Sequence, residues 1–171
     1  MRRALLALAF FAAGASAQIQ SDWERENEDR LRQSSEQVVP PPPLDRRRLV
    51  EISAPPAAET GFRYFIDSAS ISVASDRIVR YALLARSPDG AENLTFEGIR
   101  CPSEYRIYAV GRSDGSWGGR ASEWRPIPRN ARATQNWLGR QYFCPARTAI
   151  LSAEEGRRAL AGARDPVVGA P

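Results

Sequence analysis

The sequence predicts an α+β fold in which an antiparallel β-meander is followed by C-terminal helices, with one disulfide joining the two parts. Short segments of alternating apolar and polar residues follow one another from residue 62 to residue 110, separated by turn-forming residues. Two helical patterns then cover 131–142 and 152–163. The chain contains two cysteines, Cys101 and Cys144, one in each part.

The strands of the meander are predicted in order along the chain. Those of the core are expected at 62–66, 71–73, 78–86, 93–101 and 105–110, and a short one is expected before the core, at 49–52. Ser87-Pro88-Asp89-Gly90 predicts a tight turn between the third and fourth core strands, because proline presets φ and glycine accepts positive φ. Gly98 interrupts the fourth core strand and is expected to mark a bulge.

The N-terminus has the pattern of a cleavable secretory signal. Arg2 and Arg3 precede an unbroken apolar run over 4–13, and Ala15-Ser16-Ala17 has the A-x-A form that signal peptidase recognises. The run is too short to span a membrane, and no later apolar run approaches ~18 residues. We therefore expect an exported protein whose mature chain has no transmembrane segment. The general secretory route and the twin-arginine route both remain open.

The two cysteines of an exported protein are typical of a structural disulfide. A redox-active pair usually needs C-x-x-C spacing, whereas Cys101 and Cys144 are far apart in the sequence. The second helical pattern opens with the capping box Ser152-Ala153-Glu154-Glu155. The first helical pattern, at 131–142, leads directly to Cys144. A disulfide is therefore expected to hold that helix against the end of the strand at 93–101.

Composition divides the chain into four parts. These are a signal peptide (1–17), an acidic, proline-containing N-terminal extension (18–60), an α+β core domain (61–149) and a C-terminal helix and tail (150–171). The extension holds 6 arginines and 9 acidic residues, and the core 13 arginines and 8 acidic residues. A basic core favours anionic partners, unless the acidic extension lies against it. Pro40–Pro43 predicts a stiff spacer, with proline recognition by a partner as the alternative.

The absence of two residue types excludes much chemistry. The chain has no histidine, and all 24 of its basic residues are arginines. This excludes the Ser-His-Asp triad, the Cys–His pair and imidazole metal ligands, together with Schiff-base and P-loop lysines. Arginine cannot replace them as a base near neutral pH. No cofactor or metal motif is present, so no cofactor and no metal are expected. Drift towards arginine codons also explains the missing lysines without any functional cause.

A stretch rich in arginine and tryptophan, over 117–142, is the candidate binding region. Its proposed ligand-binding residues are Trp117, Arg120, Trp124, Arg125, Arg132 and Trp137, and it also contains Arg129 and Arg140. Aromatic rings stack on sugars or bases, and guanidinium groups bind phosphate or carboxylate. Alternatively, the tryptophans belong to the core and the arginines stack over them.

Four carboxylates are candidates for an acid/base pair: Asp67, Asp76, Glu97 and Glu104. A glycoside hydrolase needs two carboxylates about 5 to 10 Å apart, and the sequence does not show that any two meet. Glu97 lies beside Gly98 and Arg100, so an ion pair with a nearby arginine is expected for it.

A series of short blocks runs through the chain. They are Phe65-Ile66-Asp67, Ser70-Ile71-Ser72-Val73, Val79-Arg80-Tyr81, Glu97-Gly98-Ile99-Arg100-Cys101, Tyr108-Ala109, Trp124-Arg125 and Tyr142-Phe143-Cys144. Over roughly 23–144 the chain thus resembles the cryptic neisserial protein-like family of exported proteobacterial proteins. The resemblance implies a cell-envelope location and the Cys101–Cys144 pairing. It transfers no catalytic residue.

The observations together predict a periplasmic, non-enzymatic binding or envelope accessory domain. Its expected partner is an anionic envelope polymer or another periplasmic protein. Two alternatives remain: a carboxylate-based hydrolase of envelope glycans, and an interaction module that uses the proline-rich N-terminal segment.

Overall fold

The structure is a computed structural model of the 171-residue chain. It describes residues 36–52, 61–130 and 133–162. The predicted signal peptide, Arg132 and the tail from residue 165 lie outside the described residues. Contacts divide the chain into two units, Met1–Glu36 and Gln37–Pro171, and the features below belong to the second.

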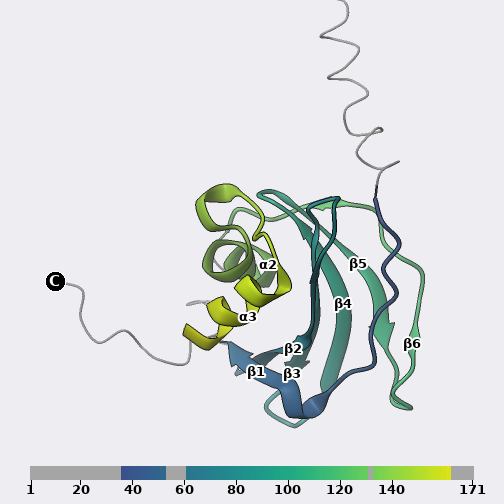
Figure 1. The fold of residues 1–171 in the computed structure, drawn as a ribbon. Helices are drawn as coiled ribbons and strands as arrows, with labels where there is room; N and C mark the ends of the chain where they lie inside the picture. Colours follow the sequence, from purple (N-terminus) through teal and green to yellow (C-terminus); the bar gives the residue numbers. More distant parts are fainter. Residues whose placement is uncertain (1–35, 53–60, 131–132, 163–171) are drawn as a thin grey trace, which may run out of the picture. The chain divides into compact units, whose positions relative to one another are not determined.

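An antiparallel meander forms the centre of this unit (Figure 1). Its strands lie side by side in chain order: β1 (Leu49–Ile52), β2 (Arg63–Val73), β3 (Val79–Arg86), β4 (Glu92–Arg100), β5 (Glu104–Gly111) and β6 (Trp117–Gly118), while β7 (Arg125–Pro126) also pairs with β5. Strand β1 comes from the predicted N-terminal extension and pairs along β2, with Leu49 opposite Asp67. The predicted fold class, a β-meander with C-terminal helices and one disulfide, is confirmed.

Strand β2 replaces the two short strands predicted at 62–66 and 71–73. Its register against β3 shifts between Asp67 and Ser72, so the expected turn is a bulge within one strand. At this bulge, polar side chains form hydrogen bonds with backbone N–H and C=O groups. Asp67 Oδ1 accepts a hydrogen bond from the Ala69 amide at 2.8 Å. Ser70 Oγ donates to the Asp67 carbonyl at 2.6 Å and accepts from the Ala82 amide at 2.7 Å.

Helical segments cover one face of the sheet (Figure 1). They are α2 (Thr134–Leu138), the π-helical turn η2 (Gly139–Phe143), the 3-10 turn η3 (Pro145–Arg147) and α3 (Ala153–Gly162). The helix predicted over 131–142 is therefore α-helical only in part. Phe143 is fully buried and stacks on Tyr81 of β3, with 4.8 Å between ring centroids. None of the helices in the described ranges has the length and apolar character needed to cross a membrane.

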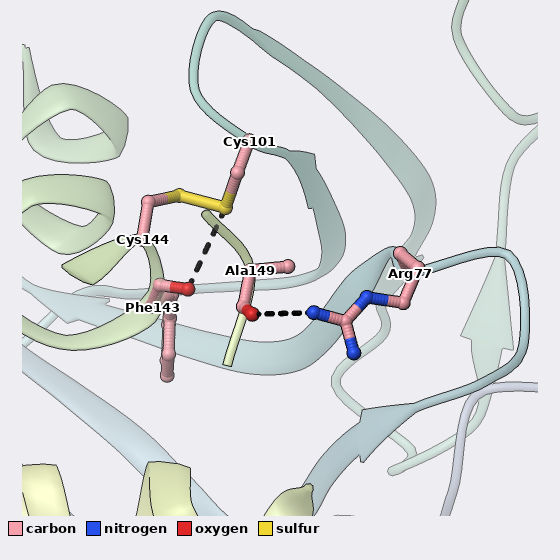
Figure 2. Close-up of a disulfide and its surroundings, with 5 residues drawn as sticks. All are labelled: Arg77, Cys101, Phe143, Cys144 and Ala149. Atoms are coloured by element: carbon pink, nitrogen blue, oxygen red, sulfur yellow. Dashed lines mark hydrogen bonds between the residues drawn. A yellow bond between two sulfur atoms is a disulfide. The ribbon is translucent and has the colours of Figure 1, made fainter. Parts of the chain in front are cut away.

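The Cys101–Cys144 disulfide joins the end of β4 to the end of η2 (Figure 2). The two Cα atoms are 5.7 Å apart, and Cys101 Sγ lies 3.5 Å from the carbonyl oxygen of Phe143. Arg77 supports the following loop by donating from Nη2 to the Ala149 carbonyl at 2.9 Å (Figure 2). The predicted link between the strand at 93–101 and the first helix is thus formed.

The opposite face of the sheet carries the segment that precedes β1. The backbone of Gln37 accepts from Arg80 Nη2 and donates to Asp76 Oδ2, both at 2.9 Å. Trp117 Nε1 donates to the Pro42 carbonyl at 2.7 Å. The proline run is therefore held along the domain surface by hydrogen bonds before it and within it, rather than serving as a spacer.

Candidate functional site

A pocket of about 620 Å³ lies where the helical segments meet one end of the sheet. Its sheet wall is formed by Pro102 and Ser103, after β4, and by Ile127 and Arg129, after β7. Its helical wall is formed by Gln135, Asn136, Gly139, Arg140, Cys144 and Arg147. The volume lies in the range of roughly 300–1,000 Å³ that is usual for small-molecule sites. Because Cys144 belongs to one wall and Cys101 precedes Pro102 of the other, the disulfide fixes the two walls together.

The pocket is strongly basic. Arg129, Arg140 and Arg147 contribute to its lining, and no carboxylate does so among the residues that the structure describes. All three are exposed, and none of their guanidinium groups has a hydrogen-bond or ion-pair partner within the described ranges. Other arginines of the domain do have carboxylate partners, including Arg46 and Arg86 with Glu92, Arg63 with Glu51, Arg80 with Asp76 and Arg100 with Glu104. The pocket thus gathers positive charge that none of the described carboxylates neutralises.

The backbone that carries Arg147 is held in an unusual conformation. Ala146 has a φ of 48° and Arg147 a φ of 66°, so two successive residues other than glycine are left-handed. Such residues cost about 1–3 kcal/mol each and cluster at functional sites. Hydrogen bonds at 3.0 Å from the Arg147 amide to the Cys144 carbonyl and from the Thr148 amide to the Pro145 carbonyl close this turn. The π-helical turn that carries Arg140 immediately precedes it, and such turns also recur at functional sites.

A buried carboxylate lies next to the helical wall. Glu97 of β4 is only 2% exposed and accepts hydrogen bonds from Thr95 Oγ1 at 2.7 Å, Tyr81 OH at 3.1 Å and Gln135 Nε2 at 3.3 Å. The predicted ion pair between Glu97 and an arginine is wrong, since its hydrogen-bond donors within the described residues are uncharged. Burial raises the pKa of the Glu97 carboxyl, and the three hydrogen bonds act in the opposite direction. Burial together with Glu97 raises the pKa of Tyr81 well above its usual value.

The aromatic candidates from the sequence lie on both faces of the sheet. Trp117 packs on Phe96 with 6.1 Å between ring centroids, on the face opposite the helices. On that same face the Arg100 guanidinium lies 4.1 Å from the ring centroid of Trp124. Trp137 instead packs against the core beneath the helical segments. The structure therefore does not bring the three tryptophans into one site.

The basic candidates are also dispersed. Arg125 is exposed on β7, and Arg120 is exposed in the loop after β6. Neither lines the arginine pocket, and Arg132 lies outside the described residues.

The candidate acid/base carboxylates have separate partners in the structure. Asp67 is paired in register with Ala82, which belongs to the cluster on the face opposite the helices, whereas Glu97 contacts Tyr81 on the helical face. Asp76 pairs with Arg80 at 2.6 Å, and Glu104 pairs with Arg100 at 3.1 Å. Nor do three His, Cys, Asp or Glu side chains gather anywhere in the described ranges.

Sequence reasoning overlooked the most informative part of the pocket. Arg129 and Arg140 fall within the basic stretch, but Arg147, Gln135 and Asn136 did not stand out from it. One signal was present: Arg140 and Arg147 flank Cys144, whose predicted disulfide leads to Pro102 and Ser103. The disulfide thus links the segment of the helical wall to the segment of the sheet wall.

The fold and the pocket define a small, disulfide-linked α+β domain with a basic pocket. Residues 27–161 match the CNP1-like family, and the chain therefore belongs to that family. This agrees with the resemblance to cryptic neisserial proteins. The family is uncharacterised and assigns no activity. No curated protein and no solved structure matches the chain significantly.

Proposed function

We propose that this protein is an exported, non-enzymatic binding domain of the periplasm, which holds an anionic group in the arginine pocket. The observation that carries the proposal is the convergence of Arg129, Arg140 and Arg147 on one pocket that no described carboxylate lines. Guanidinium groups bind carboxylate and phosphate through paired hydrogen bonds. An anionic ligand would supply the partners that arginines elsewhere in the domain find within the protein.

The chemistry of the lining supports binding rather than catalysis. Beside the arginines, the described polar side chains are the hydroxyl of Ser103 and the amides of Gln135 and Asn136. None of these groups accepts or releases a proton near neutral pH without an activating partner. Glu97, which accepts a hydrogen bond from Gln135, is itself buried and does not line the pocket.

Export is supported by two features of the chain. The sequence begins with the pattern of a secretory signal, and the only two cysteines form a disulfide. Disulfides persist in oxidising compartments such as the periplasm. The proposal therefore places the pocket where anionic envelope components, peptidoglycan fragments among them, are within reach.

The contacts of the proline run favour an intramolecular role over partner recognition. Trp117 uses the Pro42 carbonyl, and Asp76 and Arg80 use the backbone of Gln37. A partner that binds this segment through the same groups would first have to break its hydrogen bonds to the domain.

A thermal-shift titration tests the proposal. Phosphate, citrate and soluble peptidoglycan fragments are added to the oxidised protein, and the expected result is a saturable rise in Tm with one of them. At a ligand concentration of 100 Kd, binding adds about 2.7 kcal/mol to the free energy of unfolding, which corresponds to several degrees in Tm.

The matched variants keep the change in net charge constant. Arg140→Gln/Arg147→Gln should abolish the shift, whereas Arg120→Gln/Arg125→Gln, which removes two exposed arginines outside the pocket, should retain it. If the rise in Tm is lost equally in the two double variants, it arises from general charge attraction rather than from the pocket. The absence of a saturable shift with every anion would refute the proposal.

A further inference from the structure

Two amide side chains of the pocket wall have their orientations fixed by the protein. Gln135 donates from Nε2 to the carboxylate of Glu97 at 3.3 Å. Asn136 donates from Nδ2 to the carbonyl of Asn130 at 2.9 Å. A carbonyl can only accept hydrogen bonds, and an ionised carboxylate can only accept them. Each amide therefore turns its NH₂ group towards the protein.

The carbonyl end of each amide is left for the pocket. Within the described residues no donor reaches Gln135 Oε1 or Asn136 Oδ1, and neither atom is among the buried polar atoms that lack a partner. Both atoms are therefore accessible from outside, and both residues line the pocket. They present hydrogen-bond acceptors beside the donors of Arg129, Arg140 and Arg147.

Glu97 stabilises this orientation of the Gln135 amide. Its carboxylate also accepts from Thr95 Oγ1 at 2.7 Å and from Tyr81 OH at 3.1 Å, so it is held in place. If the Gln135 amide rotated by 180°, its oxygen would face a carboxylate oxygen, and two acceptors would repel each other. The buried carboxylate thus acts through Gln135 as a positioning residue.

Donors and acceptors side by side require a ligand with both kinds of group. The arginines attract an anionic group, while the carbonyl oxygens of the two amides repel it and call for hydroxyl or N–H donors. From this we infer that the pocket binds a hydroxylated anion of sugar size, a sugar acid or a sugar phosphate, with its anionic group on the arginines and its hydroxyl groups donating to Gln135 and Asn136. The inference rests on the proposed function and specifies its ligand class.

Matched ligand pairs test the inference by calorimetric titration of the oxidised protein. Glucuronate is compared with cyclohexanecarboxylate, and glucose 6-phosphate with cyclohexylmethyl phosphate, so that each pair differs chiefly in its ring hydroxyls. We expect at least one hydroxylated anion to bind about tenfold or more tightly than its partner, since its hydroxyl groups satisfy the acceptors of both amides. Whichever pair shows the preference identifies the anionic group.

Two variants separate the role of the amide from the stability of the fold. Gln135→Leu removes the acceptor and should bring the affinity ratio of the preferred pair towards one, mainly by weakening the hydroxylated ligand. Glu97→Gln lets the Gln135 amide rotate and should lower the same ratio while Gln135 itself is intact. Asn93→Leu removes an exposed amide on β4 and should leave the ratio unchanged.

The outcomes distinguish an error in the ligand class from an error in the proposed anion binding. If hydroxylated and unhydroxylated anions bind equally, and Gln135→Leu changes neither, the inference is overturned while the anion pocket stands. If none of the four ligands binds and phosphate, citrate and peptidoglycan fragments also fail, both the inference and the proposed function are overturned.

Discussion

Removal of the disulfide should destabilise the protein and loosen its pocket at the same time. The bond joins residues 43 positions apart and ties η2 to the turn after β4. In the chain-entropy treatment, closing a loop of this length removes about 13 cal/mol/K from the unfolded chain, or about 4 kcal/mol at 25 °C. Because a domain of this kind is usually stable by only about 5–15 kcal/mol, the loss would be large.

The Cys101→Ala/Cys144→Ala double variant measures this loss by urea unfolding. Phe143 remains buried against Tyr81, so the variant is expected to fold with a lower midpoint. Its anion affinity should also fall, because the bond no longer holds the two pocket walls together. Reduction of the unsubstituted protein serves as the control and should reproduce both changes.

A decrease of less than about 1 kcal/mol in the free energy of unfolding would refute this reasoning. It would mean that the core alone fixes the helical wall. Full retention of anion binding by the double variant would separately refute the structural role given to the disulfide in the pocket.

Three further predictions concern the sheet and its buried charges. Asp76→Asn leaves the fully buried Arg80 without its ionised partner at 2.6 Å and should destabilise the protein by about 3–5 kcal/mol in urea unfolding. Gly98→Ala places a methyl group 2.6 Å from Tyr108 Cε2 and should lower the free energy of unfolding by about 1–3 kcal/mol, measured by thermal unfolding. Burial raises the pKa of Glu97 from its ordinary 4.5, so its contribution to stability is present below that pH and is lost as the pH rises through the folded-state value. The stability of Glu97→Gln relative to the unsubstituted protein should therefore increase with pH in that window, as measured by urea unfolding at a series of pH values.

Each of these predictions has a matched control. Glu154→Gln breaks an exposed ion pair with Arg157 and should change stability by less than about 0.5 kcal/mol. Gly162→Ala adds a methyl group where no atom lies within 4 Å and should be tolerated. Glu123→Gln, at an exposed position, should not reproduce the pH dependence expected for Glu97. Stability losses as large in the first two controls as at Asp76 and Gly98 would contradict the packing argument, and a stability difference for Glu97→Gln that falls with pH would contradict the burial argument.

The parts of the fold that local sequence patterns specify were predictable. The strand expected over 78–86 is β3, and the turn at Ser87–Gly90 joins it to β4, because alternation and turn chemistry are properties of neighbouring residues. The long strand β2 was not predictable, since its bulge depends on the hydrogen bond between Ser70 and Ala82 of the neighbouring strand. Local patterns do not carry that information.

The candidate site was harder to predict for a related reason. Arg129 lines the same pocket as Arg140 and Arg147 through the pairing of β7 with β5 and the disulfide between the two walls, which are contacts between residues far apart in the sequence. The left-handed backbone at Ala146 has no local sequence signal, because alanine does not favour that region. The tryptophans stand out in the sequence, yet Trp117 and Trp137 pack on opposite faces of the sheet.

Arginine side-chain NMR tests the central claim most directly. In a ¹H–¹⁵N spectrum of the Nε–Hε groups, titration with whichever of glucuronate and glucose 6-phosphate binds more tightly should shift the signals of Arg129, Arg140 and Arg147 together, with one common affinity. The signals of Arg120 and Arg125 should stay in place. Uniform, non-saturating shifts across all five arginines, or shifts confined to Arg120 and Arg125, would contradict the account of an anion-binding pocket.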